Sequence, residues 1–173
     1  MPLPLLWIGA GAAALYAGTK LTREMQVSKG HINHFPGECA QLVTPQNGAV
    51  VCCGIYEVFQ HTGIWVDNQI VELRGNGLIR AISPERFLHD RSGNRIYVAC
   101  DHSRSALSSD VVAKRAIDRV FDYSEYDLIE NNCHRFTHHC VSGRDEPVTR
   151  FAELNEKLCE LYGTTLYWQP ADI

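Results

Sequence analysis

The sequence predicts an α+β fold in which an antiparallel sheet packs against helices. Strand-like runs come first, between residues 49 and 100, and helical patterns follow, between residues 110 and 162. This separation of strands from helices along the chain favours an α+β over an alternating α/β architecture. The length of 173 residues, with 45% hydrophobic and 21% charged residues, suits one globular domain with a modest extra segment.

The predicted sheet rests on strand-like runs at residues 49–56, 58–66, 69–73 and 95–100. The first run, AVVCCGIY, is continuously apolar with β-branched members, as expected of a strand buried on both faces. Asp67 and Asn68 separate the second run from the third with turn-forming side chains. These two runs therefore predict a β-hairpin.

Helices are expected over residues 84–88, 110–121, 133–142 and 148–162. Ser83 followed by Pro84 signals the start of the first helix, and Ser108 or Ser109 caps the second. The side chains expected to face the core are Val112, Ala116, Ile117, Val120 and Phe121 in the second helix and Phe151, Leu154, Leu158 and Leu161 in the last. The terminal residues 164–173 could form a final strand or a packed tail.

Cys133 is the candidate nucleophile. A cysteine is reactive only as its thiolate, and the N-terminus of a helix lowers the pKa of a thiol placed there. Asn131 and Asn132 are good helix-capping residues immediately before it, and Gly143 supplies the stop. The alternative is that Cys133 is a small buried core residue.

The number and spacing of the cysteines indicate the redox state of the thiols. The seven cysteines, at positions 39, 52, 53, 100, 133, 140 and 159, contain no CxxC pair and no regular disulfide spacing. This predicts a reducing compartment with mostly buried thiols, although the odd count leaves one disulfide open.

A net charge of -4 and a pI near 6.0, with scattered basic residues, exclude nucleic acid as a partner.

His61 is the candidate base for the thiol, and Glu72 is the candidate residue that orients it. If Asp67 and Asn68 form a two-residue turn, Gly63 faces Glu72 across the hairpin. Because side chains alternate along a strand, His61 then shares a sheet face with Gly63 and lies diagonal to Glu72. A register shifted by one residue would send Glu72 to the opposite face.

A metal site is the alternative for the histidines that follow Cys133. His134 and His138 are four residues apart on the predicted helix, a spacing that zinc can use. No acidic residue lies between them, however, and the neighbouring Cys52 and Cys53 lack zinc-finger spacing. We therefore expect no metal and no other cofactor, with these histidines at the surface or capping the helix.

The first twenty residues predict a membrane-anchoring helix. Residues 2–18 are apolar and uncharged, which is just long enough to span a bilayer. Lys20, Arg23 and Lys29 follow this run, so the positive-inside rule places the remaining chain on the cytoplasmic side. A helix that lies on the membrane surface or packs against protein is the alternative.

A linker with an irregular loop is expected over residues 21–45. This segment has no sustained hydrophobic period and contains Pro36 and Pro45. The predicted organisation is therefore an anchor at residues 1–20, this linker, and one domain at residues 46–173.

Two stretches, HTGIWVDNQIVEL from His61 and YDLIENNCHRFTHHCVSG from Tyr126, resemble the lecithin:retinol acyltransferase (LRAT)-like branch of the permuted NlpC/P60 papain-like superfamily. Papain-like enzymes normally present the cysteine first, whereas the permuted group presents the histidine strand first and the Asn-Cys helix last, as here. The resemblance covers about residues 46–143. It implies a papain-like fold and a thiol enzyme in which Cys133 attacks an ester or amide carbonyl, with His61 as base.

This chain departs from the family pattern in two places. Acyltransferase-type members often have Asn-Cys-Glu-His-Phe, where this chain has His134 and Arg135 after Cys133. They also commonly have a second histidine one residue closer to His61 than Glu72 is. Since a carboxylate can orient an imidazole, the expected catalytic set remains Cys133, His61 and Glu72.

The expected function is a cysteine-dependent acyl hydrolase or acyltransferase at a membrane, acting on phospholipid or other acyl esters and amides. The main-chain N–H of Cys133 is expected to help stabilise the oxyanion. One alternative is a cysteine peptidase or amidase acting on peptide bonds, including those of cell walls. Another is a catalytically inactive, membrane-tethered interaction module.

Overall fold

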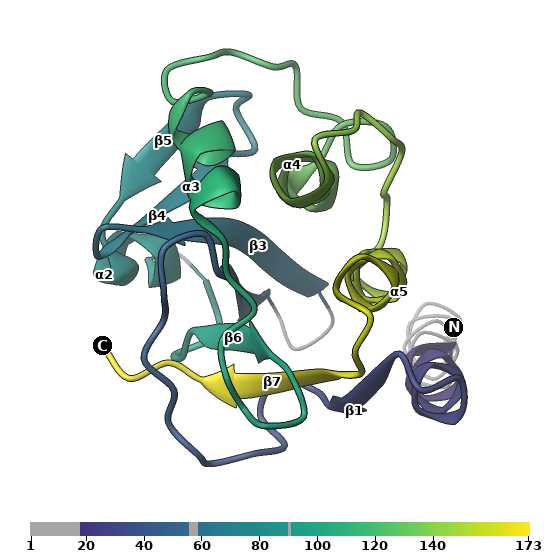
Figure 1. Ribbon diagram of the computed structural model, residues 1–173. Helices are drawn as coiled ribbons and strands as arrows, with labels where there is room; N and C mark the ends of the chain where they lie inside the picture. Colours follow the sequence, from purple (N-terminus) through teal and green to yellow (C-terminus); the bar gives the residue numbers. More distant parts are fainter. Residues whose placement is uncertain (1–17, 56–58, 90) are drawn as a thin grey trace, which may run out of the picture.

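The computed structural model describes residues 18–55, 59–89 and 91–173. Within them one sheet of seven strands has the order β1-β7-β6-β2-β3-β4-β5 (Figure 1). The strands are β1 (Ile32–His34), β2 (Val50–Ile55), β3 (Phe59–Val66), β4 (Gln69–Leu73), β5 (Ile79–Ile82), β6 (Tyr97–Cys100) and β7 (Leu166–Pro170). With the helices described below, the α+β prediction is confirmed.

The sheet is mixed, so the prediction of a purely antiparallel sheet was wrong at one edge. There β1 pairs in parallel with β7, while the remaining strand pairs are antiparallel. The short strand β1 comes from the segment expected to be a linker. Its pairing brings together Ile32 and Leu166, which are far apart in the sequence.

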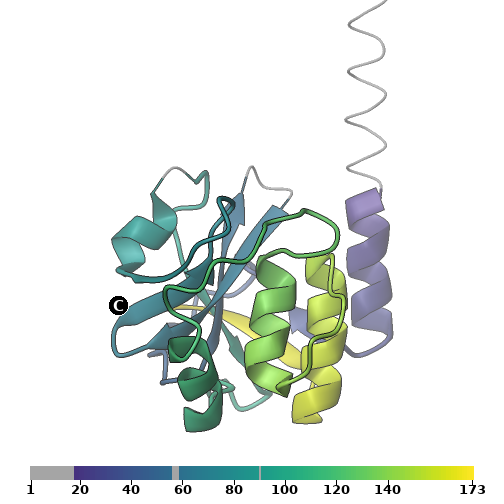
Figure 2. The same ribbon diagram turned by 90° about the horizontal axis from the view of Figure 1, so that it is seen from above.

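Helices cover both faces of the sheet (Figure 2). The labelled helices are α2 (Pro84–Leu88), α3 (Asp110–Ile117), α4 (Cys133–Ser142) and α5 (Phe151–Tyr162), and a further helix occupies residues 18–28. One hydrophobic cluster lies between the sheet and α3, α4 and α5, and a second lies on the opposite face with Phe87 of α2. Accordingly, α4 contacts β3 and β4 from one side while α2 contacts β4.

Strand β2 is buried on both faces, as its continuous apolar run predicted. Val50 and Cys52 belong to the cluster beneath α3 to α5, whereas Val51 and Cys53 belong to the cluster on the α2 side. All four side chains have 0% exposure. Because β2 lies between β6 and β3, this strand is the centre of the core.

The hairpin of β3 and β4 has the predicted register. Val66 pairs with Gln69 and Ile64 pairs with Val71. Asp67 and Asn68 have φ values of 47° and 60°, which two-residue hairpin turns require at both central positions.

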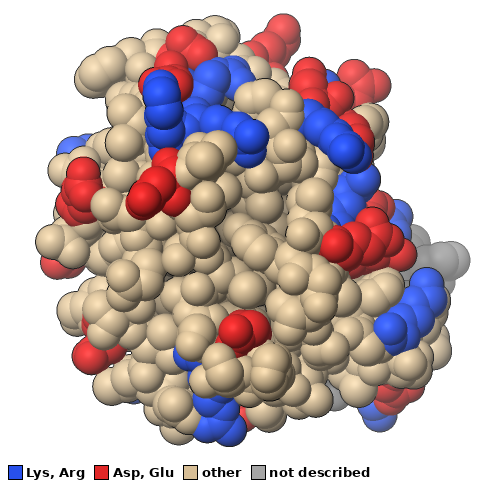
Figure 3. All heavy atoms as spheres, in the orientation of Figure 1, with Lys and Arg blue, Asp and Glu red and all other residues tan. Residues whose placement is uncertain are grey.

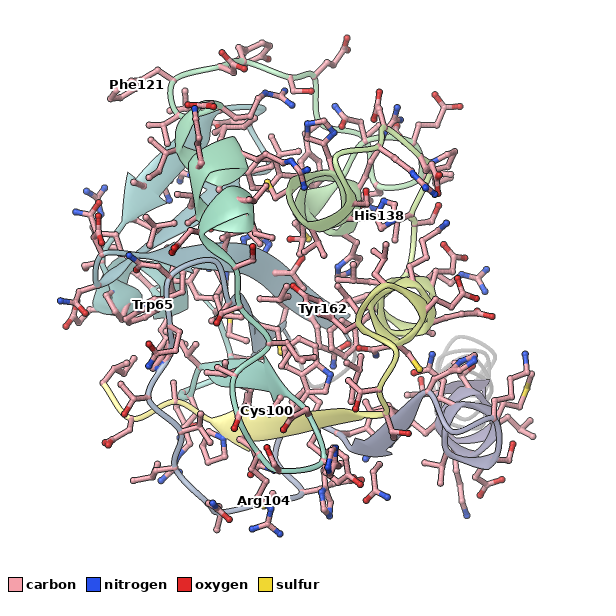
Figure 4. All side chains as sticks on the ribbon, in the orientation of Figure 1. Trp65, Cys100, Arg104, Phe121, His138 and Tyr162 are labelled. Atoms are coloured by element: carbon pink, nitrogen blue, oxygen red, sulfur yellow. The ribbon has the colours of Figure 1, made fainter. Side chains whose placement is uncertain are left out.

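The predicted starts of α2, α3 and α4 were correct, but α5 starts at Phe151 rather than at residue 148, and α3 ends earlier than expected. It stops at Ile117, which is 48% exposed, and Phe121 has a φ of 74° and is 85% exposed. Phe121 extends away from the body of the protein (Figure 4). The reason is that its main-chain N–H donates to Ile79 O, so the chain turns to follow β5, a strand the sequence analysis missed. Leu161, expected in the core, is likewise 44% exposed.

The predicted membrane-anchoring helix at residues 1–20 lies almost entirely outside the described residues. In the part of the chain that is described, no helix has the length and apolar character needed to cross a bilayer.

The expected linker at residues 21–45 is more ordered than predicted, since its first part is helical to residue 28 and Ile32–His34 forms β1. Gln26 fixes this helix to α5 by donating to Ala152 O at 2.5 Å.

Gly63 marks a close approach within the hairpin, which gives a test of the fold. An added Cβ would lie 2.7 Å from Ile70 Cγ2 and 2.8 Å from the Val71 carbonyl oxygen. Gly63→Ala should therefore lower the free energy of unfolding by roughly 1–3 kcal/mol. Urea denaturation measures this, with Gly75→Ala as the control because that position has open space. Equal stabilities of the two variants would contradict the close approach.

Candidate active site

Helix α4 begins at Cys133 because Asn132 caps it. The Asn132 side-chain oxygen accepts hydrogen bonds from the main-chain N–H groups of His134 (2.9 Å) and Arg135 (3.1 Å). Its amide nitrogen donates to Leu128 O and Thr149 O, both at 2.9 Å. The cap is buried and fully hydrogen-bonded, so the position of Cys133 at the helix N-terminus is fixed.

The neighbouring Asn131 does not cap the helix but shapes the segment before it. Its amide donates to Ser124 Oγ at 2.7 Å and to Glu125 O at 2.5 Å. Of the two predicted capping asparagines, therefore, one caps the helix and the other holds the segment that carries Tyr126.

His61 and Glu72 meet as the hairpin register predicted. His61 Nε2 lies 2.7 Å from Glu72 Oε2, and the two side chains are 6% and 0% exposed. The neutral or protonated imidazole donates from Nε2 to the carboxylate, which leaves Nδ1 for the thiol. The Phe87 ring of α2 contacts the imidazole at a centroid distance of 5.2 Å.

Two arginines that the sequence analysis missed hold the Glu72 carboxylate. Arg80 donates to Oε1 from Nε at 2.9 Å and from a terminal nitrogen at 2.8 Å. Arg91 donates to Oε2 at 2.9 Å. Burial alone would raise the pKa of Glu72, but the hydrogen bonds and charges of His61 and Arg91 lower it to about 2. Glu72 is therefore ionised throughout the physiological pH range.

The pKa of Cys133 and the pKa of His61 are shifted in opposite directions. Burial would raise the pKa of Cys133, which is 4% exposed, but the imidazoles of His134 and His61 hold it well below the ordinary thiol value. Burial would lower the pKa of His61, but Cys133 and the hydrogen bond to Glu72 raise it. Both shifts favour the ion pair over the neutral thiol and imidazole.

His134 is a second imidazole beside the sulfur. Its Nδ1 lies 3.9 Å from Cys133 Sγ and 3.2 Å from the hydroxyl of Thr62 on β3. Thr137 donates to the same hydroxyl at 3.0 Å. His134 is therefore buried and fixed against the sheet, which corrects the expectation of a surface or capping histidine.

Tyr126 is a further site residue that the sequence analysis did not assign. Its hydroxyl lies beside the Cys133 thiol, and burial together with the charge of that thiol raises the pKa of Tyr126. The phenol therefore stays protonated and is available as a hydrogen-bond donor beside the sulfur. Its signal in the sequence was weak, because a half-buried tyrosine in an irregular segment has many structural explanations.

The environment of Cys133 differs from that of the other buried cysteines. All seven cysteines are free thiols. Burial raises the pKa of Cys140, on the same helix, to about 12, and that of Cys53, partly offset by Arg91, to about 11. The prediction of mostly buried thiols is confirmed, and Cys133 is set apart by its two imidazole neighbours rather than by exposure.

A cavity of about 530 Å³ lies beside Tyr126, between α4, the end of α3 and the segment before α4. Leu73, Ile79 and Phe136 provide buried apolar lining. The charged lining residues are Arg119, Glu125, Asp127, Glu130, Arg135 and Asp145. Figure 3 shows charged side chains of both signs gathered over α3 and α4, while the middle of that face is largely uncharged.

His138, which was also expected at the surface or capping the helix, is buried and only 2% exposed. Its side chain projects from α4 on the side away from α3 (Figure 4), and burial lowers its pKa. Over residues 18–55, 59–89 and 91–173, no three His, Cys, Asp or Glu side chains are grouped to hold a metal ion.

No family model, curated protein or solved structure matches this chain. The chemistry of the site therefore rests on its geometry. The site combines a thiol of lowered pKa at a helix N-terminus, an imidazole held by a carboxylate, and two hydrogen-bond donors beside the sulfur. This combination suits nucleophilic attack on a carbonyl carbon.

The lowered pKa of Cys133 predicts the pH dependence of its alkylation. For an ordinary thiol, the fraction present as thiolate falls roughly a hundredfold between about pH 8 and about pH 6. Iodoacetamide alkylation of Cys133, followed by peptide mass spectrometry, should fall far less over that range. His61→Ala should shift the profile towards that of an ordinary thiol, because the paired cation is lost. A wild-type profile like that of a free thiol would refute the ion pair.

The buried Glu72 predicts a large and pH-dependent loss of stability on neutralisation. Glu72→Gln leaves Arg80 and Arg91 without their counter-charge, which should cost roughly 3–5 kcal/mol near neutral pH. Since its pKa falls from 4.5 to about 2 on folding, the wild-type advantage should be complete above pH 4.5 and vanish as the pH falls towards 2. Denaturation across this pH range measures the difference.

Glu146→Gln is the matched control, because Glu146 forms a half-buried ion pair with Lys157 at 2.8 Å. Since solvent screens this pair, its loss should cost far less than the loss of the Glu72 charge. If both variants lost the same free energy of unfolding, Glu72 would not be a buried electrostatic centre.

Proposed function

We propose that this protein is a cysteine-dependent acyl hydrolase or acyltransferase that works through a thioester acyl-enzyme at Cys133. The observation that carries the proposal is the buried 2.7 Å contact between His61 and Glu72 next to a helix-capped thiol of lowered pKa. A merely structural cysteine needs neither an oriented imidazole nor a cationic environment.

In the first half-reaction the Cys133 thiolate attacks the carbonyl carbon of an ester or amide. The carbonyl oxygen becomes an oxyanion, which the Cys133 main-chain N–H and the protonated Tyr126 hydroxyl can stabilise. The His61 imidazolium then donates its Nδ1 proton to the leaving oxygen or nitrogen. The carbon–heteroatom bond breaks, and a thioester remains on Cys133.

In the second half-reaction neutral His61 takes a proton from water or from an acceptor alcohol or amine. The resulting nucleophile attacks the thioester carbonyl, the carbon–sulfur bond breaks, and the thiolate is restored beside protonated His61. Glu72 remains ionised throughout and holds the imidazole ring, since its pKa of about 2 excludes proton uptake.

The permuted papain-like arrangement is part of this proposal. In its support, β3 with His61 precedes α4 with Cys133 in the chain, and α4 packs against β3. In papain-like chemistry the third residue varies in type, so Glu72 can take the orienting role.

Phospholipid or another lipid ester is the proposed substrate class, with the protein associated with a membrane. The apolar, uncharged residues 2–18 of the sequence support this choice. The apolar part of the cavity beside Tyr126 also offers space for part of an acyl chain.

Acyl transfer to Cys133 provides the direct test. Wild-type protein incubated with phospholipid, short-chain thioester or ester, and peptide substrates should give an intact-mass adduct that hydroxylamine removes. Cys133→Ala should lower turnover by at least roughly a thousandfold. Cys159→Ala, which removes a half-buried thiol on α5, is the control and should retain activity. Turnover that survives Cys133→Ala, or an adduct only at another residue, would refute the proposal.

A further inference from the structure

A second cavity lies on the α2 side of the molecule, and its lining is strongly basic. It has a volume of about 600 Å³, and its lining residues come from the connection between β4 and β5, from β5, from helix α2 and from the segment that follows α2. Its lining residues are Arg74, Gly75, Arg80, Arg86, His89 and Arg91. No carboxylate appears among these described lining residues, although Glu72 lies directly behind Arg80 and Arg91.

The guanidinium groups of this cavity differ in what they already bind. Arg80 and Arg91 are 19% and 14% exposed and are held by Glu72. Arg91 also donates to Phe87 O and lies over the Phe87 ring, with its central carbon 4.7 Å from the ring centroid. These two arginines are therefore pre-oriented in the cavity wall.

Arg74 and Arg86 have exposed side chains. Among residues 18–55, 59–89 and 91–173, neither side chain takes part in a hydrogen bond or an ion pair. Among the described residues, four guanidinium groups thus line one cavity, and Glu72 pairs with two of them, Arg80 and Arg91. Concentrating like charges in this way is unfavourable unless an anion binds between them.

We propose that this cavity binds a phosphate group, as a phosphate ester or a phospholipid head group. Guanidinium groups bind phosphate oxygens through paired, charge-assisted hydrogen bonds, and several arginines around one cavity can contact several oxygens at once. A single carboxylate ligand offers only two oxygens and one charge, so it matches four guanidinium groups less well. The volume accommodates a head group rather than an ion alone.

The position of the cavity gives this site a role in the proposed reaction. Arg80 and Arg91 contact Glu72, and Glu72 contacts His61, so the cavity wall lies one side chain from the base. A substrate anchored here by its phosphate would have its position fixed relative to the acid–base residues. That role in substrate selection rests on the proposed function, whereas phosphate binding itself does not.

Binding can be measured on the full chain carrying Cys133→Ala, so that no turnover interferes. Isothermal titration with inorganic phosphate, and with acetate at the same ionic strength, tests the preference for phosphate. Flotation with phosphatidylcholine vesicles, with and without phosphatidic acid, tests the lipid source.

Arg74→Gln with Arg86→Gln is the test variant, because both side chains are exposed and neither contacts Glu72. Lys29→Gln with Arg95→Gln is the control, since both are exposed, lie outside the cavity and change the net charge equally.

The proposal predicts that phosphate binds more tightly than acetate, and that the Arg74/Arg86 variant weakens phosphate binding at least tenfold while the control variant does not. If only the vesicles containing phosphatidic acid show this dependence, the site binds the anionic phosphomonoester head group of a lipid rather than the phosphodiester of phosphatidylcholine. Equal weakening by the two variants, or no dependence on Arg74 and Arg86 in either assay, would overturn the site. Because every measurement uses Cys133→Ala, the result tests phosphate binding independently of the acyl transfer proposed for Cys133.

Discussion

The buried carboxylate of Glu72 is the interaction on which the site depends. It is 0% exposed, yet its two oxygens receive hydrogen bonds from His61, Arg80 and Arg91 at 2.7–2.9 Å. An ionised carboxylate at such a depth is stable only while these partners remain in place. It therefore fixes β3, β4, β5 and the segment after α2 relative to one another. On one side it orients the imidazole that faces Cys133, and on the other it positions two guanidinium groups in the basic cavity.

The contrast between two thiols of α4 shows how local charge selects one of them. Cys133 and Cys140 are both buried, but burial raises the pKa of Cys140 to about 12 while that of Cys133 is lowered. Cys133 occupies the helix N-terminus, where main-chain N–H groups favour a negative charge, and two imidazoles adjoin it. His134 adds to this environment from the position next to Cys133, with its Nδ1 3.9 Å from the sulfur. The cationic surroundings, rather than access to solvent, distinguish the candidate nucleophile.

Local signals predicted much of the fold and the centre of the site. The Asp67-Asn68 turn determined the hairpin register, and the register alone brought His61 and Glu72 to the same face. Contacts between distant segments were beyond such reasoning. Strand β5 is only four residues long and lacks a clear alternation, so its Arg80 could not be placed opposite Glu72. Tyr126 reaches the thiol from an irregular segment, and β1 pairs with β7 across almost the whole described chain.

The central claim is that His61 is an imidazolium because Cys133 is a thiolate. Nuclear magnetic resonance titration of the His61 ring, with wild-type protein and Cys133→Ala compared under the same conditions, tests it most directly. The account predicts that the His61 pKa lies above its ordinary value of 6.5 in the wild type. It also predicts that the pKa falls in Cys133→Ala, because the negative charge is removed while Glu72 remains. An unchanged His61 titration in the two proteins would contradict the ion pair and the proposed chemistry with it.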